Sequence, residues 1–324
     1  MATVYRWTGF IFSMLLPASM PAASAQDYPM KPIRAMVPAA PGGGTDVAAR
    51  PVAQKLAERL GQQVIIDNRG GANGNIGLAI AARAAPDGYT LLFVSNSPMA
   101  INPALYANVP YDPVRDFAPV AMIKQSYFLL VIHPSVAANS VRELIQLAKG
   151  GNRLVQASSG IGSAAHLSGE ILKNRAKIDF VHVPYRGGGP AMAAVIAGEA
   201  SFMFVEVIVG MPFINAGKLK LLAVATPKRI AALPDTPTLT EASFPGYDPT
   251  GWAALFVPTG TPRSIIDKLN EQVKAILKLP DVQKVLANDG TEFGQNTPDY
   301  VSVFLKSEIA KWGNAVKISG VRAE

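Results

Sequence analysis

The sequence predicts an α/β fold with mainly parallel sheets, because strand-like and helix-like runs alternate along most of the chain. Glycine-rich loops such as 41–46 and 185–191 join several of these strands to the helices that follow. Hydrophobic residues make up 49% of the 324 residues, enough to fill the cores of about two domains at ~150 residues each. These observations favour two similar α/β lobes joined by extended crossings.

The N-terminal segment is predicted to be a cleaved signal peptide, residues 1–25. Arg6 precedes a short apolar run, 7–16, and the small residues 23–25 form a cleavage site before Gln26. The apolar run is shorter than the ~20 residues that a membrane-spanning helix needs. We therefore expect export and a mature chain of 324 − 25 = 299 residues.

The first part of the mature chain has three aliphatic runs typical of strands: 33–37, 63–68 and 89–96. A helix is expected to end near Leu60, and a second helix is expected over 74–84. The segment 95–106 is expected to be a loop. A Pro-rich connection then leads to a long apolar stretch, 120–133.

The second part of the chain continues the alternation. Further strands are expected at 154–158, 180–185, 201–205, 218–225 and 251–258. The segments 158–174 and 186–199 are each expected to begin as a glycine loop and continue as a helix, and further helices are expected at 140–150, 262–277 and 298–316. Ser140 with Glu143 forms a capping box at the first of these helices, and Thr297 with Pro298 suits the start of the last.

Four glycine loops precede helical patterns: 41–46, 70–77, 158–163 and 185–191. A helix N-terminus offers unpaired N–H groups and a positive dipole end, and glycine lets a ligand approach them closely. One such loop often serves steric needs alone, but four favour an anion site in a shared cleft. Arg186 is the basic residue within these loops and Arg69 directly precedes the second, and this scarcity of basic residues favours a small carboxylate over a phosphate.

Neither common nucleotide motif matches the first loop. A P-loop needs Gly-Lys-Ser/Thr, whereas Thr45 and Asp46 follow Gly44, and a dinucleotide motif needs a small residue where Val47 stands. The chain has no cysteine, which excludes disulfides, thiol catalysis and cysteine metal sites. The formal charge of +7 is scattered, without the Lys/Arg clusters and stacking aromatics of a nucleic-acid surface.

An enzymatic alternative rests on a few residues. Ser159, Ser163 and His166 superficially suggest a serine nucleophile with a base. The G-x-S-x-G elbow is absent, however, and Ser163 and His166 have the spacing of a helix cap. His133 and His182 are expected to be structural. Binding is therefore favoured over hydrolysis, and no catalytic residue, cofactor or metal is expected.

The chain resembles the Bug/TctC family, the solute-binding proteins of tripartite tricarboxylate transporters. The resemblance is carried in order by YPMKPIRAMVPAAPGGGTDVAAR, VIIDNRGGANGNIG, PDGYTLL, SSGIGSAAHL, HVPYRGGGPAMAAVIAGE, INAGKLKLLAV and WAALFVPTGTP. It implies a type II periplasmic-binding-protein fold, in which two α/β lobes close on a ligand cleft about hinge crossings. We expect lobe 1 to comprise 26–126 and 226–324, and lobe 2 to comprise 127–225.

The resemblance also implies a function. We expect a monomeric, non-enzymatic periplasmic receptor that binds a small organic carboxylate and delivers it to membrane permease subunits. A receptor of the same fold that serves a sensor protein is the alternative, and a secreted hydrolase is a distant one. Neighbouring genes for two membrane subunits favour transport, whereas a neighbouring sensor kinase favours sensing.

The expected ligand contacts lie in the loops of both lobes. Backbone amides of the first loop and the loops facing it are implied to hold the carboxylate. The expected residues are Ala40, Pro41, Gly42, Gly43, Thr45, Ser95, Asn96, Ser97, Ser159, Gly160, Ser163, His166, Tyr185, Gly187, Gly188 and Val205. Amino-acid-binding members often have an aspartate where Val205 stands, and Glu206 is expected to point away if Val205 faces the cleft. A dicarboxylate or aromatic acid is therefore expected in preference to an amino acid.

Overall fold

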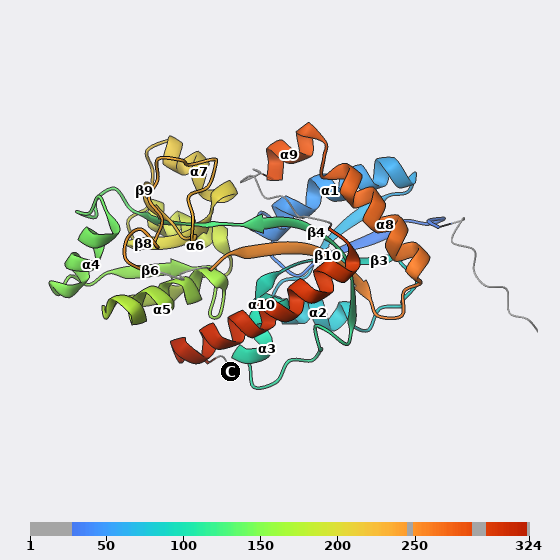
Figure 1. The fold of residues 1–324 in the computed structure, drawn as a ribbon, viewed down its shortest axis with the longest axis horizontal. Coiled ribbons are helices and arrows are strands. Elements are labelled where there is room, and N and C mark those ends of the chain that lie inside the picture. Colours follow the sequence, from blue (N-terminus) through green and yellow to red (C-terminus); the bar gives the residue numbers. More distant parts are fainter. Residues whose placement is uncertain (1–27, 245–248, 287–295, 323–324) are drawn as a thin grey trace, which may run out of the picture.

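Two five-stranded sheets form the framework of a computed structural model that describes residues 28–244, 249–286 and 296–322. Figure 1 shows the sheets side by side, each with its own helices. The predicted α/β class and two-lobed fold are thus confirmed. The predicted signal peptide lies outside the described residues.

The first sheet has the strand order β2-β1-β3-β10-β4. Its strands are β1 (Ile33–Val37), β2 (Val64–Asn68), β3 (Thr90–Ser95), β4 (Phe117–Ser126) and β10 (Gly251–Pro258). β1 runs parallel to β2 and β3, whereas β10 runs antiparallel to β3 and β4. The helices of this lobe include α1 (Gly44–Leu60), α2 (Asn75–Ala81), α8 (Arg263–Ile276) and α9 (Pro280–Leu286).

The second sheet repeats this layout in the order β7-β6-β8-β5-β9. Its strands are β5 (Phe128–Ile132), β6 (Val155–Ser158), β7 (Val181–Pro184), β8 (Phe202–Glu206) and β9 (Lys220–Val224). β6 is parallel to β7 and β8, and β5 is antiparallel to β8 and β9. The helices are α4 (Val141–Lys149), α5 (Ala164–Ala176), α6 (Gly188–Ile196) and α7 (Val207–Asn215).

The shared layout places functional loops at corresponding positions. In parallel α/β sheets, ligands bind beyond the carboxyl ends of the strands, where the connecting loops gather. The loops after β1 and β3 leave the first sheet at such ends, and those after β6 and β8 leave the second. The chain passes from β4 to β5 through Tyr127, which makes β4 one of the crossings between the lobes.

The C-terminal helix α10 (Pro298–Ser319) connects the two lobes. Its start is as predicted, because the Thr297 side chain accepts a hydrogen bond from the backbone N–H of Tyr300 at 3.2 Å. Buried Glu308 accepts hydrogen bonds from the indoles of Trp252 on β10, at 2.9 Å, and Trp312, at 3.0 Å. At its far end, the carbonyl of Ile318 accepts a hydrogen bond from the Asn174 side chain of α5, at 3.3 Å.

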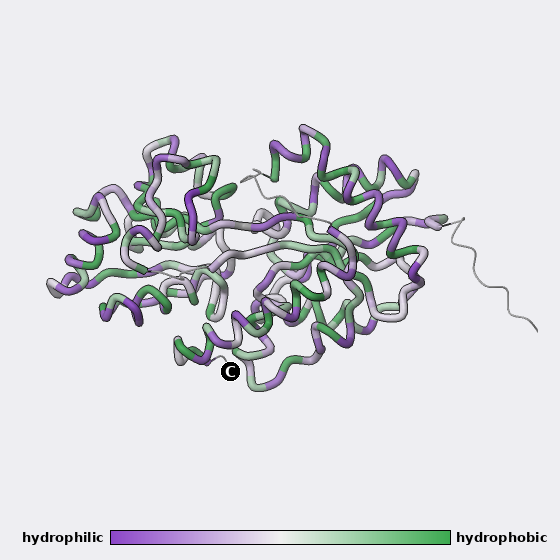
Figure 2. Tube along the Cα trace, viewed as in Figure 1, coloured by the Kyte–Doolittle hydropathy of each residue, from purple (hydrophilic) through white to green (hydrophobic). Residues whose placement is uncertain are grey.

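One hydrophobic core contains residues of both lobes. Leu92 of the first sheet and Phe202 of the second belong to one buried cluster, which also includes Leu305 and Trp312 of α10. Figure 2 shows hydrophobic and hydrophilic residues alternating along α10, as expected of a helix that covers a sheet. In the described part of the chain, no helix combines the length and apolar character of a membrane span.

The structure differs from the sequence prediction at 95–106, which was expected to be a loop. A π-helical turn, η3 (Ser97–Ile101), and a short helix, α3 (Asn102–Leu105), occupy this segment. Its prolines and polar residues are typical of loops, but its apolar side chains are buried against α10. Helices α7 and α9 were also not predicted. α7 begins directly at the end of β8, without a polar capping sequence.

Candidate functional site

The first glycine loop joins β1 to α1 and is closed by its own hydrogen bonds. The Gly42 N–H donates to the Asp46 carboxylate at 2.9 Å, and the Gly43 N–H donates to the Ala40 carbonyl at 3.2 Å. Gly42 has a φ of +77°, a conformation that favours glycine, whereas Gly43 has a φ of −72°. The amides of Gly42 and Gly43, two of the residues that the sequence suggested for ligand binding, are therefore used within the loop.

Asp46 holds this loop in place. Its side chain is 1% exposed, pairs with Arg50 at 2.9 Å and accepts a hydrogen bond from the Asn68 amide at 3.0 Å. Burial alone would raise the pKa of Asp46, but hydrogen bonds from Arg50, Gly42 and Asn68 outweigh it and keep the pKa below its ordinary value. Asp46 is thus a structural anion of the loop, consistent with its position in the first turn of α1.

The next N–H groups belong to the first turn of α1. The first hydrogen bond within the helix runs from the Val47 N–H to the Gly43 carbonyl at 2.9 Å. The N–H groups of Gly44, Thr45 and Asp46 precede it and make no hydrogen bond to the described part of the chain. These groups, rather than those of Gly42 and Gly43, are the donors available at the positive end of α1.

Loops from the second lobe approach this loop across the gap between the sheets. The position of a Cβ on Gly187, in the loop before α6, lies 3.9 Å from the Cβ of Ala40. A Cβ on Gly162, in the loop after β6, would lie 3.1 Å from the Cγ of Leu105 at the end of α3. Glycine loops predicted on different lobes therefore face each other, as a cleft between lobes requires.

Glu206 is a second-lobe residue that reaches the first lobe. It ends β8, and its carboxylate stands where a Cβ on Gly44 would be, with Cδ 2.6 Å from that position. The same carboxylate forms an ion pair with Lys124 of β4, with Nζ 2.5 Å from Oε2. Glu206 thus joins lobe 2 to two elements of the first sheet's lobe.

The expected orientation of Val205 and Glu206 was wrong. Val205 is 5% exposed and packs in the core of the second lobe, against Gly210 of α7. The two side chains do point to opposite faces, as strand geometry demands, but Glu206 is the one that faces the first lobe. Because α7 covers the Val205 face of β8, the preference for acids without an amino group loses its structural basis.

Three candidate residues lie at the carboxyl end of β3, the central strand of the first sheet. Ser95 pairs with Ala253 of β10, and Ser97 begins η3. Asn96, between them, is 4% exposed, and its side-chain Nδ2 has no hydrogen-bond partner in the described residues. A buried amide donor without an acceptor is costly. Asn96 is therefore the candidate of this group that most needs an additional acceptor, such as a ligand oxygen or a water.

The loop after β6 is supported by a histidine pair. The rings of His166 and His182 stack with centroids 3.8 Å apart. His166 Nδ1 accepts a hydrogen bond from the Gly162 N–H at 3.0 Å, and His182 Nε2 lies 2.7 Å from Ser158 Oγ. Burial lowers the pKa of His166 to about 3 and that of His182 to about 4, so both rings are neutral at neutral pH.

This geometry assigns supporting roles to two predicted residues. Ser163 caps α5 by accepting the His166 backbone N–H at 3.2 Å, as its spacing suggested. The second ring nitrogen of His166, Nε2, lies 3.7 Å from the Glu170 carboxylate. Both ring nitrogens thus face protein groups, and a direct ligand contact by His166 finds no support here. Ser159 and Gly160 are partly exposed on the loop itself.

The remaining candidates of the second lobe surround the start of α6. The Tyr185 N–H donates to the Ser158 carbonyl at 2.9 Å, which ties this loop to the neighbouring one. Gly187 is the residue before α6 and has a φ of +114°. A Cβ on Gly188 would meet open space, so the first turn of α6 is accessible. Pro41 lies exposed on the opposite loop.

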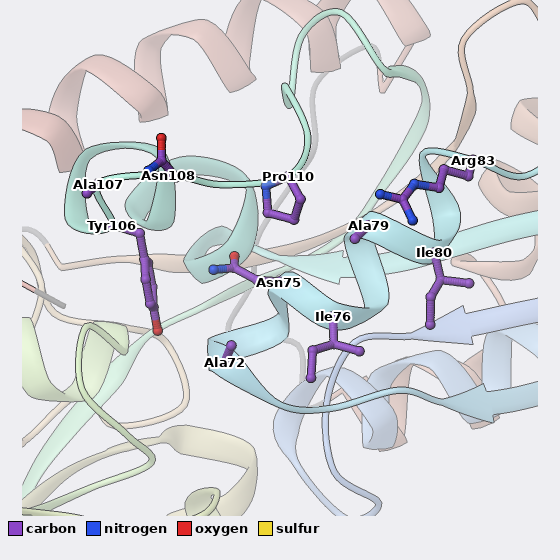
Figure 3. Close-up of a pocket in the computed structure, with 10 residues that line it drawn as sticks. All are labelled: Ala72, Asn75, Ile76, Ala79, Ile80, Arg83, Tyr106, Ala107, Asn108 and Pro110. Atoms are coloured by element: carbon purple, nitrogen blue, oxygen red, sulfur yellow. The ribbon is translucent and has the colours of Figure 1, made fainter. Parts of the chain in front are cut away.

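A separate hollow of about 560 Å³ lies on the first lobe between α2 and the segment 106–110. Figure 3 shows Tyr106 and Arg83 at opposite ends of it, with Ile76 of α2 between them. Sequence reasoning did not identify it, because its apolar residues resemble an ordinary buried helix face. In the described part of the chain, no group of three acidic, histidine or cysteine side chains is arranged to hold a metal ion.

Two α/β lobes with strand-end loops facing each other are the architecture of periplasmic binding proteins such as BugD, whose structure this chain matches with a TM-score of 0.85. Residues 48–321 match the model of the tripartite tricarboxylate transporter family receptor, TctC, and the chain belongs to this family. The family consists of solute-binding receptors rather than enzymes, which confirms the expectation of a non-enzymatic protein and implies a periplasmic location.

Three similar proteins illustrate the relationship. Protein BugT of Bordetella pertussis is 34% identical over 301 residues, covering 92% of each chain. The R. palustris protein Rpa4515, solved with adipate, is 34% identical with a TM-score of 0.87, over 91% of this chain and 99% of that one. MatC from Rhodopseudomonas palustris, solved with bound malate, is 32% identical with a TM-score of 0.83, over 89% and 100%.

Proposed function

We propose that this protein captures a small organic carboxylate between its lobes and delivers it to the membrane subunits of a tripartite tricarboxylate transporter. The family match supports a transport receptor, and two similar structures hold dicarboxylates, adipate and malate. The observation that supports the proposal most is the approach of lobe 2 to the N-terminus of α1, because N–H donors without a protein partner lie near this contact between the lobes.

The proposed binding mode follows from the free donors. A carboxylate is held by the N–H groups of Gly44 and Thr45, with Asn96 as a further donor. Ala40, Gly187 and Gly188 form the walls on the two sides of the cleft. Hydrogen bonds from N–H groups to an ionised acceptor are roughly twice as strong as those to neutral acceptors, so few donors suffice.

We propose the lobe boundaries expected from the sequence: lobe 1 comprises 26–126 and 226–324, and lobe 2 comprises 127–225. We also propose that the protein is a monomer. We propose that residues 1–25 direct export and are removed. Intact-mass measurement of protein from the periplasm tests the cleavage, and analytical ultracentrifugation tests the monomer.

Native mass spectrometry of the protein purified from its host tests ligand capture. A bound species with the mass of a small carboxylic acid is expected. Added back at 100 times its dissociation constant, that acid stabilises the fold by about 2.7 kcal/mol, which a thermal-shift assay detects. A protein that carries and binds no carboxylate would contradict the proposal. Delivery is tested by uptake of the labelled acid in cells with and without the receptor.

A further inference from the structure

Lys124 is a buried cation with unused hydrogen-bonding capacity. Its side chain is 5% exposed, and its ammonium carries three N–H donors. One of these reaches Glu206 at 2.5 Å, and the ammonium makes no other hydrogen bond to the described residues. A buried ammonium is stable only when its donors are matched by acceptors. The position therefore suits an additional anionic acceptor in the cleft.

Glu206 provides the complementary charge at the same place. Its side chain is 24% exposed, so its carboxylate is accessible as well as paired. It stands against Gly44 at the N-terminus of α1, where the proposed ligand carboxylate is held. A ligand carboxylate held beside Glu206 is repelled by it, and a hydroxyl or ammonium next to that carboxylate offsets the repulsion by donating a hydrogen bond to Glu206.

We propose that Lys124 and Glu206 determine ligand specificity by selecting acids that carry a hydrogen-bond donor on the carbon next to a carboxylate. This inference rests on the proposed function and deepens it. The Lys124 ammonium and the α1 N–H groups receive the carboxylate, and the Glu206 carboxylate accepts the hydrogen bond from the neighbouring hydroxyl or ammonium. In the protein, the Lys124 donor and the Glu206 acceptor lie side by side. They match a ligand in which a carboxylate has a hydrogen-bond donor next to it.

The test compares two matched sets of acids by calorimetry. Succinate, malate and aspartate differ only in hydrogen, hydroxyl or ammonium on one carbon, and propionate, lactate and alanine form the shorter set. At least one set is expected to bind, with its substituted acids about tenfold or more tighter than the unsubstituted one. Comparing the hydroxy acids, malate and lactate, with the amino acids, aspartate and alanine, shows whether Glu206 prefers a hydroxyl or an ammonium as the donor.

Substitutions assign the effect to the pair. Glu206→Gln keeps the shape but removes the charge, so it is expected to abolish the preference and to leave the unsubstituted acid unchanged or tighter. Lys124→Met is expected to weaken every acid by about tenfold or more. Glu58→Gln and Lys55→Met are matched controls, because these residues form an ion pair, 3.0 Å apart, on the same helix α1 but away from its N-terminus.

The outcomes separate this inference from the proposed function. Succinate or propionate binding as tightly as its substituted partners, or an unchanged preference in Glu206→Gln, overturns the inference while ligand capture stands. Failure of all six acids to bind also overturns it. The proposed function fails as well only if native mass spectrometry finds no carboxylic acid on the protein.

Discussion

The Glu206 carboxylate stands at the position that a side chain on Gly44 would occupy, although the two residues belong to different lobes. A glycine at this position of α1 therefore allows the end of β8 to reach the first turn of the helix. Lys124, on the strand β4 that leads from one lobe to the other, forms an ion pair with Glu206 at this contact. The first-lobe loop and the second-lobe strand end meet at this point.

The first prediction concerns Gly44→Ala. The new Cβ would lie 2.6 Å from the Glu206 Cδ, so the Glu206 carboxylate must move away from the N-terminus of α1. Ligand affinity is expected to fall about tenfold or more, with little change in melting temperature, because alanine favours helix. Gly189→Ala on α6 is the control, since a Cβ there meets nothing within 4 Å. Equal affinities for the two variants would disprove a role for the contact.

The second prediction concerns Asp46→Asn. The substitution removes the negative charge from a side chain that accepts hydrogen bonds from Arg50, Asn68 and the Gly42 N–H. The free energy of unfolding is therefore expected to fall by about 2 kcal/mol. Urea denaturation measures the change. Glu58→Gln, in an exposed pair, should change stability by less than about 1 kcal/mol. A loss in Asp46→Asn no larger than this control would be inconsistent with a structural anion.

The third prediction concerns pH. Because the folded pKa of His166, about 3, lies below its ordinary 6.5, its contribution to stability is full above pH 6.5. It is lost as the pH falls toward 3, at up to ~1.4 kcal/mol per pH unit. Denaturation curves between neutral and acidic pH should show a shallower pH dependence in His166→Gln than in the unsubstituted protein. The same slope in both proteins would refute the assignment.

The fourth prediction is domain closure. A Cβ added to Gly162 would meet Leu105 and one added to Gly187 would lie 3.9 Å from Ala40, so the lobes lie close together here, and ligand binding is expected to favour this arrangement. Small-angle scattering should give a smaller radius of gyration with saturating ligand than without it. Identical curves would indicate a rigid receptor.

Much of the fold could be predicted from the sequence because its signals are local. Short aliphatic runs between glycine loops mark the strands, and Ser140 and Thr297 cap helices as their sequence context suggested. The segment 95–106 was mispredicted because burial against α10, a contact distant in sequence, outweighs its loop-like composition.

The site was only partly predictable for the same reason. Strand alternation placed Val205 and Glu206 on opposite faces, but only the position of α7 determines which face is buried. Lys124 was the one charge within a long apolar run, 120–133, and that irregularity was the available signal for it. Its partner across the cleft could not be read from a single sequence.

A crystal structure of the protein with its identified carboxylate tests the central claim most directly. The ligand carboxylate should lie within hydrogen-bonding distance of the Gly44 and Thr45 N–H groups and of the Lys124 ammonium. A carboxylate bound in the hollow between α2 and 106–110, or anywhere else outside the cleft, would contradict the proposed site.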